Sequence, residues 1–165
     1  MGFPVTCHLA PFEDENYGLV DGPGLPGVEQ TLKNHPKLKW FGHSMAFWCE
    51  IGKYTGQAAR FGYPKGEVVE GRLAELFRRY PNIYGDLSAA SGCGALMRDK
   101  AYGIKFMNEF QDRLLFGMDI ARPWEVHSKL PGYLNSLLAE GAISQTVYDK
   151  IAFKNAERLL AEVKA

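Results

Sequence analysis

The stretch LKWFGHSMAFW, residues 38–48, decides the fold of this chain. It follows Pro36, begins with a short apolar run and reaches a polar residue at His43. Short apolar runs that are bounded by turn-forming residues are typical of buried strands. The stretch therefore predicts a strand over residues 38–43 that ends in a histidine, and residues 44–52 can form one or two helical turns after it.

Three further segments have the same form, an apolar run followed by a residue capable of metal or proton chemistry. They predict strands over residues 3–8, 82–87 and 113–119, with a long loop after the first strand. Strands that alternate with helices imply parallel pairing. The helices are predicted over residues 25–34, 68–80, 100–111, 130–140 and 144–160, the last as one helix or two, and residues 88–97 are predicted to be a loop that leads into a helical turn.

Two α/β architectures fit this order of elements: an open doubly wound sheet and a section of a (β/α) barrel. An open sheet of this kind usually binds its ligand through a glycine-rich first turn. The turn after the first strand, HLAP at residues 8–11, has no such motif, and GxxxxGK[ST] does not occur in the chain. The absence of these motifs weakens the nucleotide-binding interpretation, whereas the repeated strand-end residues point to the catalytic end of a β/α barrel.

The composition fits one domain, residues 1–165, with a core of its own. Of the 165 residues 46% are hydrophobic, and 19 basic residues balance 19 acidic ones. Nucleic acids and anionic membranes are bound through basic surfaces, so the balanced charge argues against both as partners. No apolar run approaches the roughly 20 residues needed to span a bilayer. Three widely spaced cysteines without a CxxC motif predict reduced thiols in a cytoplasmic protein.

The four strand ends carry the candidate functional residues His8, His43, Asp86 and Asp119. In a barrel of parallel strands all carboxyl ends meet at one face, where the active site is built. Two imidazoles and a carboxylate are suitable ligands for a divalent metal such as zinc. Such a metal lowers the pKa of bound water to near neutrality, and a neighbouring carboxylate can take the proton. The structural alternative is a hydrogen-bonded loop histidine and a helix-capping aspartate.

Two aromatic residues, Phe47 and Trp48, follow His43 and have two interpretations. They can wall a substrate pocket for an aromatic or unsaturated acid, or they can pack the loop onto the rim of the barrel. Asp86 and Ser88 likewise can hydrogen-bond the substrate, or they can cap the helix that follows.

Three other features have a structural interpretation. Arg98 and Asp99 predict an ion pair at a helix start, with binding of a substrate carboxylate by Arg98 as the alternative. Cys49, six residues after His43, is interpreted as a small apolar side chain rather than as a nucleophile. His127 lies in the last loop and is expected to be exposed, with access to the site as the alternative.

Five segments, taken in order, resemble the second half of the amidohydrolase superfamily: PVTCHL, GLPGVEQTLKNHPKLKWFGHSMAFWCEI, PNIYGDLSAASG, DRLLFGMDI and IAFKNAERLL. The similarity is to the amidohydrolase-related group that includes aminocarboxymuconate-semialdehyde decarboxylase, and it covers nearly the whole chain. It implies that the four predicted strands are strands five to eight of a (β/α)8 barrel. The expected fold is therefore a parallel half-barrel of the TIM type with extra C-terminal helices.

The resemblance also implies roles for three strand-end residues. The fifth-strand histidine of that family binds metal, which corresponds to His8. The sixth-strand histidine polarises the substrate or binds a second metal, which corresponds to His43. The eighth-strand aspartate binds metal and shuttles a proton, which corresponds to Asp119. The implied activity is hydrolysis of a small organic acid, amide or ester by a water activated on zinc or manganese, or decarboxylation by a carbon–carbon lyase of the same group.

The chain departs from the family pattern at the first strand, where the family carries a His-x-His pair. None of the four histidines of this chain forms such a pair. A complete barrel needs about 250 residues, so the chain corresponds to an N-terminally incomplete half-barrel. Because a half-barrel leaves strand edges unpaired, the expected partner is a second copy or a complementary half-barrel chain. Two other hypotheses stand beside the enzyme: a non-catalytic fragment, and an unrelated α/β module that binds a small molecule.

Overall fold

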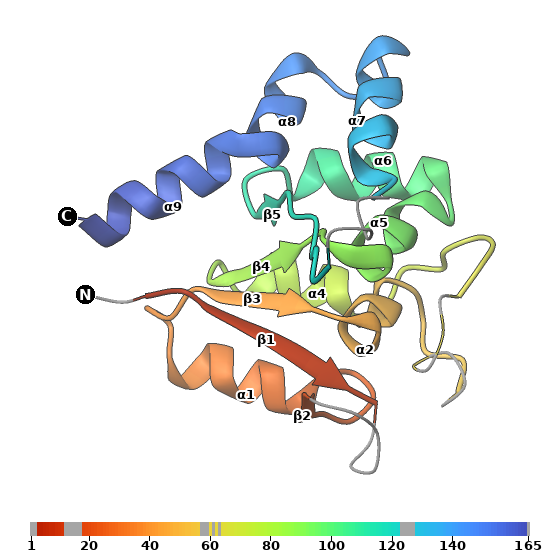
Figure 1. Ribbon diagram of the computed structural model, residues 1–165. Helices are drawn as coiled ribbons and strands as arrows, with labels where there is room; N and C mark the ends of the chain where they lie inside the picture. Colours follow the sequence, from red (N-terminus) through yellow and green to blue (C-terminus); the bar gives the residue numbers. More distant parts are fainter. Residues whose placement is uncertain are drawn as a thin grey trace.

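The protein is built around one parallel β-sheet (Figure 1). The computed structural model describes residues 3–11, 18–56, 60, 62, 64–122 and 128–164. The five strands follow the spatial order β2-β1-β3-β4-β5, and every neighbouring pair is parallel. The predicted α/β class and parallel pairing are thereby confirmed. The strands are β1 (Val5–Ala10), β2 (Leu19–Val20), β3 (Trp40–His43), β4 (Ile83–Asp86) and β5 (Leu114–Leu115).

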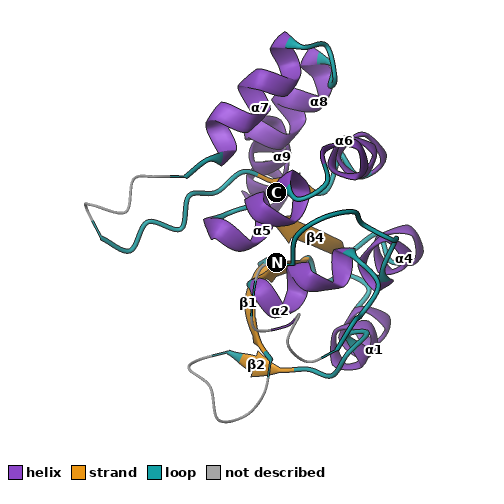
Figure 2. Cartoon of the chain, turned by 90° about the vertical axis from the view of Figure 1, so that its right-hand side faces the viewer, coloured by secondary structure: helices purple, strands orange, loops and turns teal. Residues whose placement is uncertain are grey.

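Helices follow the strands along the chain, and α1, α4 and α6 cover the same face of the sheet (Figure 2). None of the helices within the described ranges is both long and apolar enough to cross a membrane. The helices are α1 (Pro26–Asn34), α2 (Met45–Trp48), the 3-10 turn η1 (Cys49–Ile51), α4 (Arg72–Arg79), α5 (Ala89–Met97), α6 (Lys100–Glu109), α7 (Leu130–Ala139), α8 (Gln145–Asp149), the π-helical turn η2 (Lys150–Lys154) and α9 (Asn155–Lys164).

The main core lies between the sheet and these helices. Successive residues of a strand point to opposite faces, and Trp40, Ile83 and Leu114 occupy the helix-covered face. Burial of a large apolar side chain stabilises a fold by about 1.5–3 kcal/mol, so this layer is the main source of stability. The helices contribute Val28, Leu32, Leu73, Leu76, Phe77, Phe106 and Phe110, all buried.

The opposite face of the sheet is covered in part by α9. Leu159 of α9 packs against Tyr84 and Leu115, next to Phe41. An ion pair between Lys39 and Glu162 joins the same helix to the start of β3. Side chains alternate along a strand. The next residues on this face after Phe41 and Tyr84 are therefore His43 and Asp86, at the carboxyl ends of β3 and β4.

Two glycines allow the short helix α2 to pack directly onto the sheet. Gly42 of β3 lies opposite Gly85 of β4. A Cβ atom at Gly42 would lie 2.1 Å from Cζ of Phe47, and one at Gly85 would lie 2.8 Å from Cη2 of Trp48. Both aromatic rings are fully buried and meet edge to face, with centroids 5.3 Å apart. The missing side chains of the two glycines therefore provide the space that the rings fill.

The ends of two strands differ from the prediction. β1 continues past His8 to Ala10, because β2, which the sequence did not predict, pairs with Leu9 and Ala10. β5 covers only Leu114 and Leu115 instead of residues 113–119. The backbone leaves the sheet after Leu115 because the amide of Phe116 donates to the carbonyl of Ile151 in η2, at 3.0 Å.

Two helices also differ from the prediction. Residues 88–97 are not a loop, because Ala89–Met97 form the helix α5. A Cβ atom at Gly92 would lie 2.6 Å from Cα of Leu87, so the glycine lets this helix pack closely on the end of β4, and packing overrides its low helix propensity. The predicted helix over residues 68–80 begins only at Arg72, because Glu70 forms an antiparallel bridge with Gly52.

The glycine at position 42 provides a test of this packing. Gly42→Ala should lower the free energy of unfolding by about 2–3 kcal/mol, because the added methyl group overlaps the ring of Phe47. Urea unfolding followed by circular dichroism measures the change. Gly132→Ala in α7 is the matched control, since nothing lies within 4 Å of its Cβ position, and it should stabilise the protein by about 0.5–1 kcal/mol. Equal effects of the two substitutions would contradict this account of the core.

Candidate functional site

The carboxyl ends of three neighbouring strands bring polar side chains together. His8 of β1 and His43 of β3 are direct partners in the parallel register, and their ring centroids lie 5.2 Å apart. Asp86 is the last residue of β4. His43 is buried, whereas His8 and Asp86 are partly exposed. The predicted convergence of strand-end residues therefore exists for these three side chains.

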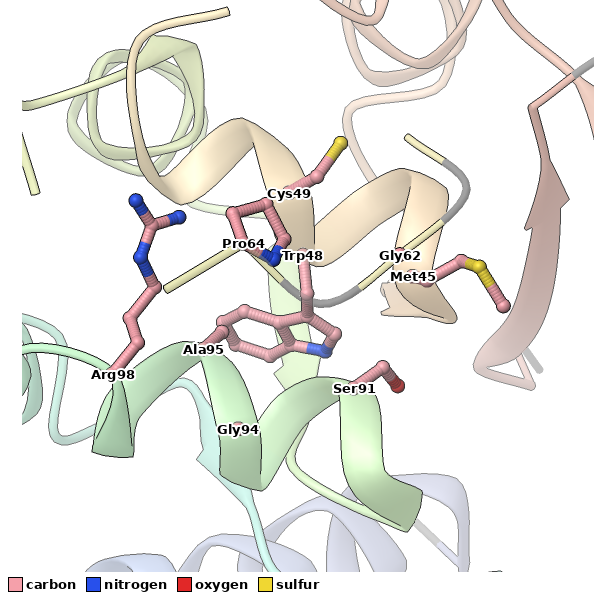
Figure 3. Close-up of a pocket in the computed structure, with 9 residues that line it drawn as sticks. All are labelled: Met45, Trp48, Cys49, Gly62, Pro64, Ser91, Gly94, Ala95 and Arg98. Atoms are coloured by element: carbon pink, nitrogen blue, oxygen red, sulfur yellow. The ribbon is translucent and has the colours of Figure 1, made fainter. Parts of the chain in front are cut away.

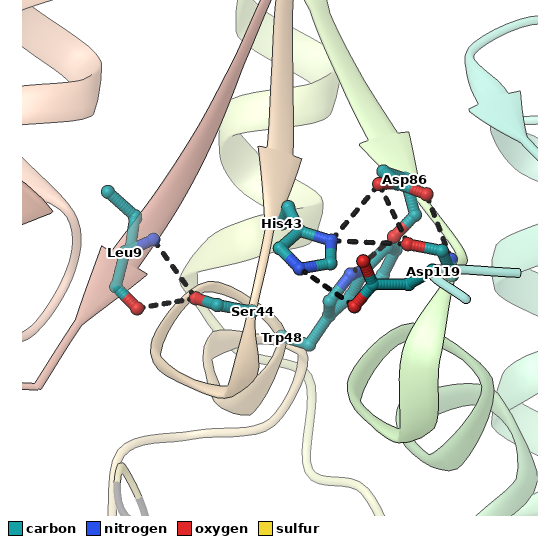
Figure 4. A network of polar contacts seen from close by, with 7 residues as sticks. Leu9, His43, Ser44, Trp48, Asp86 and Asp119 are labelled. Carbon is teal, nitrogen blue, oxygen red and sulfur yellow. Dashed lines mark hydrogen bonds and ion pairs between the residues drawn. The ribbon is translucent and has the colours of Figure 1, made fainter. Parts of the chain in front are cut away.

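The imidazole of His43 is fixed by a carboxylate. Its Nδ1 atom lies 3.0 Å from Oδ2 of Asp86 (Figure 4). Asp86 is held in turn by Ser88, whose amide donates to Oδ1 at 2.9 Å and whose hydroxyl donates to Oδ2 at 2.9 Å. With the proton of His43 on Nδ1, toward the carboxylate, Nε2 is turned toward the open side of the site.

Although Ser88, His43 and Asp86 are close together, they do not form a catalytic triad. The hydroxyl of Ser88 lies 3.2 Å from Nδ1 of His43, the same nitrogen that contacts Asp86. A nucleophilic serine and its orienting aspartate must contact opposite nitrogens of the histidine. Ser88 is therefore a residue that holds Asp86 in place.

Asp119 approaches His43 from the segment after β5. Its Oδ2 atom lies 3.7 Å from Nε2 of His43, and its side chain is 54% exposed. Asp119 has φ 53, a left-handed conformation that aspartate tolerates better than most residues. At Gly117, a Cβ atom would lie 2.8 Å from Cβ of Ser88. The glycine thus lets this segment pass close to β4, which brings the carboxylate of Asp119 to the imidazole.

Two hydrogen bonds fix the strand ends that carry the site. Nε1 of Trp48 donates to the carbonyl of Asp86 at 2.8 Å. The amide of Leu9 donates to Oγ of Ser44 at 3.1 Å, and that hydroxyl donates back to the carbonyl of Leu9. Sequence reasoning missed Ser44 as a link between β1 and β3, because only the parallel register brings it beside Leu9.

Charges at the site shift the pKa values of both histidines and of Asp86. The hydrogen bond with Asp86 raises the pKa of His43, burial opposes this, and the charges of Asp86 and Asp119 reinforce it. Burial acts to raise the pKa of Asp86, but the hydrogen bonds from His43 and Ser88 outweigh burial and lower it. Burial and the charge of His43 lower the pKa of His8, against the opposing effect of Asp119. His43 thus carries a proton more readily than His8.

Some of the side chains at the strand ends are possible metal ligands. The imidazoles of His8 and His43 and the carboxylate of Asp119 are donor types that zinc accepts. Within residues 3–11, 18–56, 60, 62, 64–122 and 128–164, however, no three His, Cys, Asp or Glu side chains are arranged to hold a metal ion. Because Nδ1 of His43 is engaged by Asp86, this ring can offer only Nε2. The residues present do not fit a complete metal site, and other donors would have to complete it.

The aromatic residues are not brought to the site. Phe47 and Trp48 are buried in the core between α2, the sheet and α5, which is the packing interpretation of the sequence. Trp48 also lines a small pocket beside Arg98 (Figure 3). The pocket volume of about 10 Å³ is close to that of a single water molecule. Cys49 is buried as well, and burial raises the pKa of its thiol to about 12, so it is not a ready nucleophile. His127 lies outside the described residues.

Two large cavities meet at Asp119. The apolar cavity, of about 570 Å³, lies between the sheet and α9 and is lined by Phe41, Leu115 and Leu159, with Asp86 at one end. The cationic cavity, of about 630 Å³, lies over α5 and is lined by Lys65, Arg98 and Lys129 together with Asp119. Both volumes lie in the range of small-molecule sites.

Comparisons with known proteins identified no relative of this chain. No family model matches the chain, and no curated protein and no solved structure matches it.

The contact between His43 and Asp86 predicts a pH-dependent contribution to stability. The pKa of His43 in the folded protein is raised above 6.5. Its contribution to stability is therefore complete below pH 6.5 and is lost as the pH rises through the folded pKa. The folded pKa of Asp86 is lowered below 3.8, so its share is present above pH 3.8 and is lost as the pH falls further. The stability difference between wild type and His43→Gln should therefore be largest between these two values.

Urea unfolding of both proteins from pH 3 to 9 in the presence of a chelator measures this difference. The same substitution at the exposed His35 controls for the loss of an imidazole elsewhere. A stability difference between wild type and His43→Gln that stays constant from pH 3 to 9 would show that the ion pair does not form.

Proposed function

We propose that this chain forms the catalytic edge of a hydrolase of the amidohydrolase type, acting on a small organic acid, amide or ester with the aid of a divalent metal ion. The observation that supports the proposal is the meeting of His8, His43 and Asp86 at the carboxyl ends of parallel strands, where Asp119 reaches them from the segment after β5. In β/α barrels this edge is where active sites are built. The resemblance of the sequence segments to the second half of that superfamily points to three of these residues, His8, His43 and Asp119.

The proton chemistry of the site rests on His43. Asp86 accepts the hydrogen bond from Nδ1, so that Nε2 is the atom that meets a substrate. Because the pKa of His43 is raised, a protonated imidazole is available near neutral pH to donate to the oxygen on which negative charge develops. Asp119, 3.7 Å from Nε2, is placed to accept a proton from the attacking water and to return it to the leaving group.

A metal ion would supply an activated water at neutral pH. His8 and Asp119 are the residues proposed to hold it, with zinc as the first choice and manganese as the second. Carbon–carbon cleavage by a lyase would use the same residues, with Nε2 of His43 as the proton donor to the carbon that loses carboxylate. The geometry of the chain's own residues serves both reactions, and the substrate decides between them.

The rival function is a non-catalytic half-barrel, and one observation favours it. The described part of the chain brings fewer than three potential metal ligands together in a suitable arrangement. A second copy of the chain, or a complementary half-barrel, would have to supply the remaining donors. The free cysteines Cys7, Cys49 and Cys93 agree with the proposal of a cytoplasmic location.

The sheet also suggests how a second copy would bind. β2 pairs with Leu9 and Ala10, and among the described residues no strand pairs with the outer edge of β1 along Val5–Cys7. Phe3 and Val5, at the start of this edge, are exposed. Unpaired edges of parallel strands tend to pair with another chain. We propose that a second copy covers this edge and closes the half-barrel.

Metal binding provides the first test. Zinc titrated into the metal-free chain should bind at one site, and His8→Ala or Asp119→Ala should weaken binding by about tenfold or more, since each removes one of few ligands. Competition with a chromogenic chelator measures the affinity. His35→Ala is the matched control, because His35 is exposed at the end of α1. No binding at all, or equal losses at positions 8 and 35, would support the non-catalytic half-barrel instead.

Association provides the second test. Sedimentation velocity at about 10–100 µM, a range where a standard-sized interface is populated, should show a dimer or larger assembly. Val5→Lys should shift it toward monomer, because a charge at a strand edge opposes pairing. Val69→Lys is the control, since Val69 is exposed away from this edge. A stable, fully folded monomer over the whole range would rule out closure by a second copy.

A further inference from the structure

The charge of the cationic cavity suggests how a substrate is held. Among the described residues that line it, three are cationic, Lys65, Arg98 and Lys129, and one, Asp119, carries a carboxylate. The chain as a whole has no net charge, so this excess of positive charge is local. A concave site lined by one sign of charge raises the local concentration of ligands of the opposite sign.

The three cations are not equivalent. Arg98 donates from Nε to the carbonyl of Gly66 and from Nη2 to that of Glu67, so its guanidinium ties the loop before α4 to α5. Among the described residues, neither Lys65 nor Lys129 forms an ion pair with a carboxylate. Arg98 thus differs from the two lysines in its hydrogen bonds to backbone carbonyls of the loop, and within the described part of the chain the lysines are the cations of this cavity that no such bond holds.

The position of Lys129 relative to α5 is supported by a second observation. Burial raises the pKa of the Cys93 thiol, and the charge of Lys129 acts in the opposite direction. Both residues line the cationic cavity. The ammonium group of Lys129 thus lies close enough to the cavity wall on α5 to act on a group placed there.

Apart from Ser128, the rest of the described cavity wall is largely apolar. Ala89, Ala90 and Met97 of α5 and Met118 line it, and Asp119 stands where the cationic and apolar cavities meet. The hydroxyl of Ser88, the N-cap residue of α5, is turned to Asp86 and makes no cap hydrogen bond to the helix.

We propose that Lys65 and Lys129 bind the carboxylate of a small substrate with an apolar body, and that they hold the substrate beside Asp119. The inference deepens the proposed function and uses its site, but the binding step itself needs neither metal nor turnover. It assigns recognition of the carboxylate to the two lysines, whereas Arg98 has a structural role. The apolar cavity on the other side of Asp119 has no cationic residue among those that line it, so it is not the anion site.

Ligand binding to the full chain tests the proposal with benzoate, benzamide and benzylamine as probes. The three share an apolar ring and differ in charge. At low ionic strength benzoate should bind about tenfold or more tightly than benzamide, and benzylamine should bind least. Raising the salt concentration from about 20 to 200 mM should reduce the preference, because the lysines are exposed. Isothermal titration calorimetry or ligand-observed NMR measures the affinities.

Substitutions separate the residues. Lys65→Met and Lys129→Met should each weaken benzoate binding about three- to tenfold and leave benzamide binding unchanged. Lys33→Met on the exposed surface of α1 is the matched control, and thermal unfolding confirms that each variant is folded. Equal binding of benzoate and benzamide, or equal losses for Lys33→Met and Lys129→Met, would overturn the proposal.

The two proposals can fail separately. His43→Gln should retain the preference for benzoate over benzamide, because His43 does not line the cationic cavity. Retained preference in a chain that binds no metal would leave the lysine site standing while the hydrolase proposal fails. Metal binding at His8 and Asp119 without any preference for benzoate would overturn the lysine site while the hydrolase proposal stands.

Discussion

The contact on which the rest of the structure depends is the packing of Phe47 and Trp48 onto Gly42 and Gly85. The two rings fill the space above a pair of glycines on neighbouring strands, where any side chain would collide with them. Since protein cores are close-packed, this contact fixes the distance of α2 from the sheet. The same Trp48 donates from Nε1 to the carbonyl of Asp86. Core packing on one face of the sheet therefore helps to fix the backbone of Asp86, whose carboxylate contacts His43 at the strand ends.

The site has a rigid half and an open half, and each has a physical cause. His43, Asp86 and Ser88 are linked by hydrogen bonds of 2.9–3.2 Å and are largely buried, so their geometry is fixed by the fold. Asp119 lies on a segment that has left the sheet and is mostly exposed. Fixed groups suit the task of holding a proton at a defined atom, and exposed groups suit the task of meeting ligands that arrive from outside.

How much of this could be predicted from the sequence depends on the range of the interactions. The strand containing His43 and the parallel order of strands follow from local apolar runs and their alternation with helices. The role of Phe47 and Trp48 did not follow, because it depends on glycines that come from two different strands. β2 and α5 were missed for a related reason: β2 is held by its pairing with β1, and α5 by a close approach at Gly92. The link from Ser44 to Leu9 likewise exists only in the assembled sheet.

The two cavities that meet at Asp119 explain why the site is open on this side. The cationic and the apolar cavity adjoin at Asp119, which lines both, and the substrate proposed above, with a charged end and an apolar body, would use both kinds of surface. The left-handed backbone of Asp119 and the close approach at Gly117 both serve to bring this carboxylate over Nε2 of His43. A strand that continued regularly through residues 116–119 would carry Asp119 along the sheet instead. The early end of β5 thus brings the carboxylate of Asp119 to the imidazole of His43.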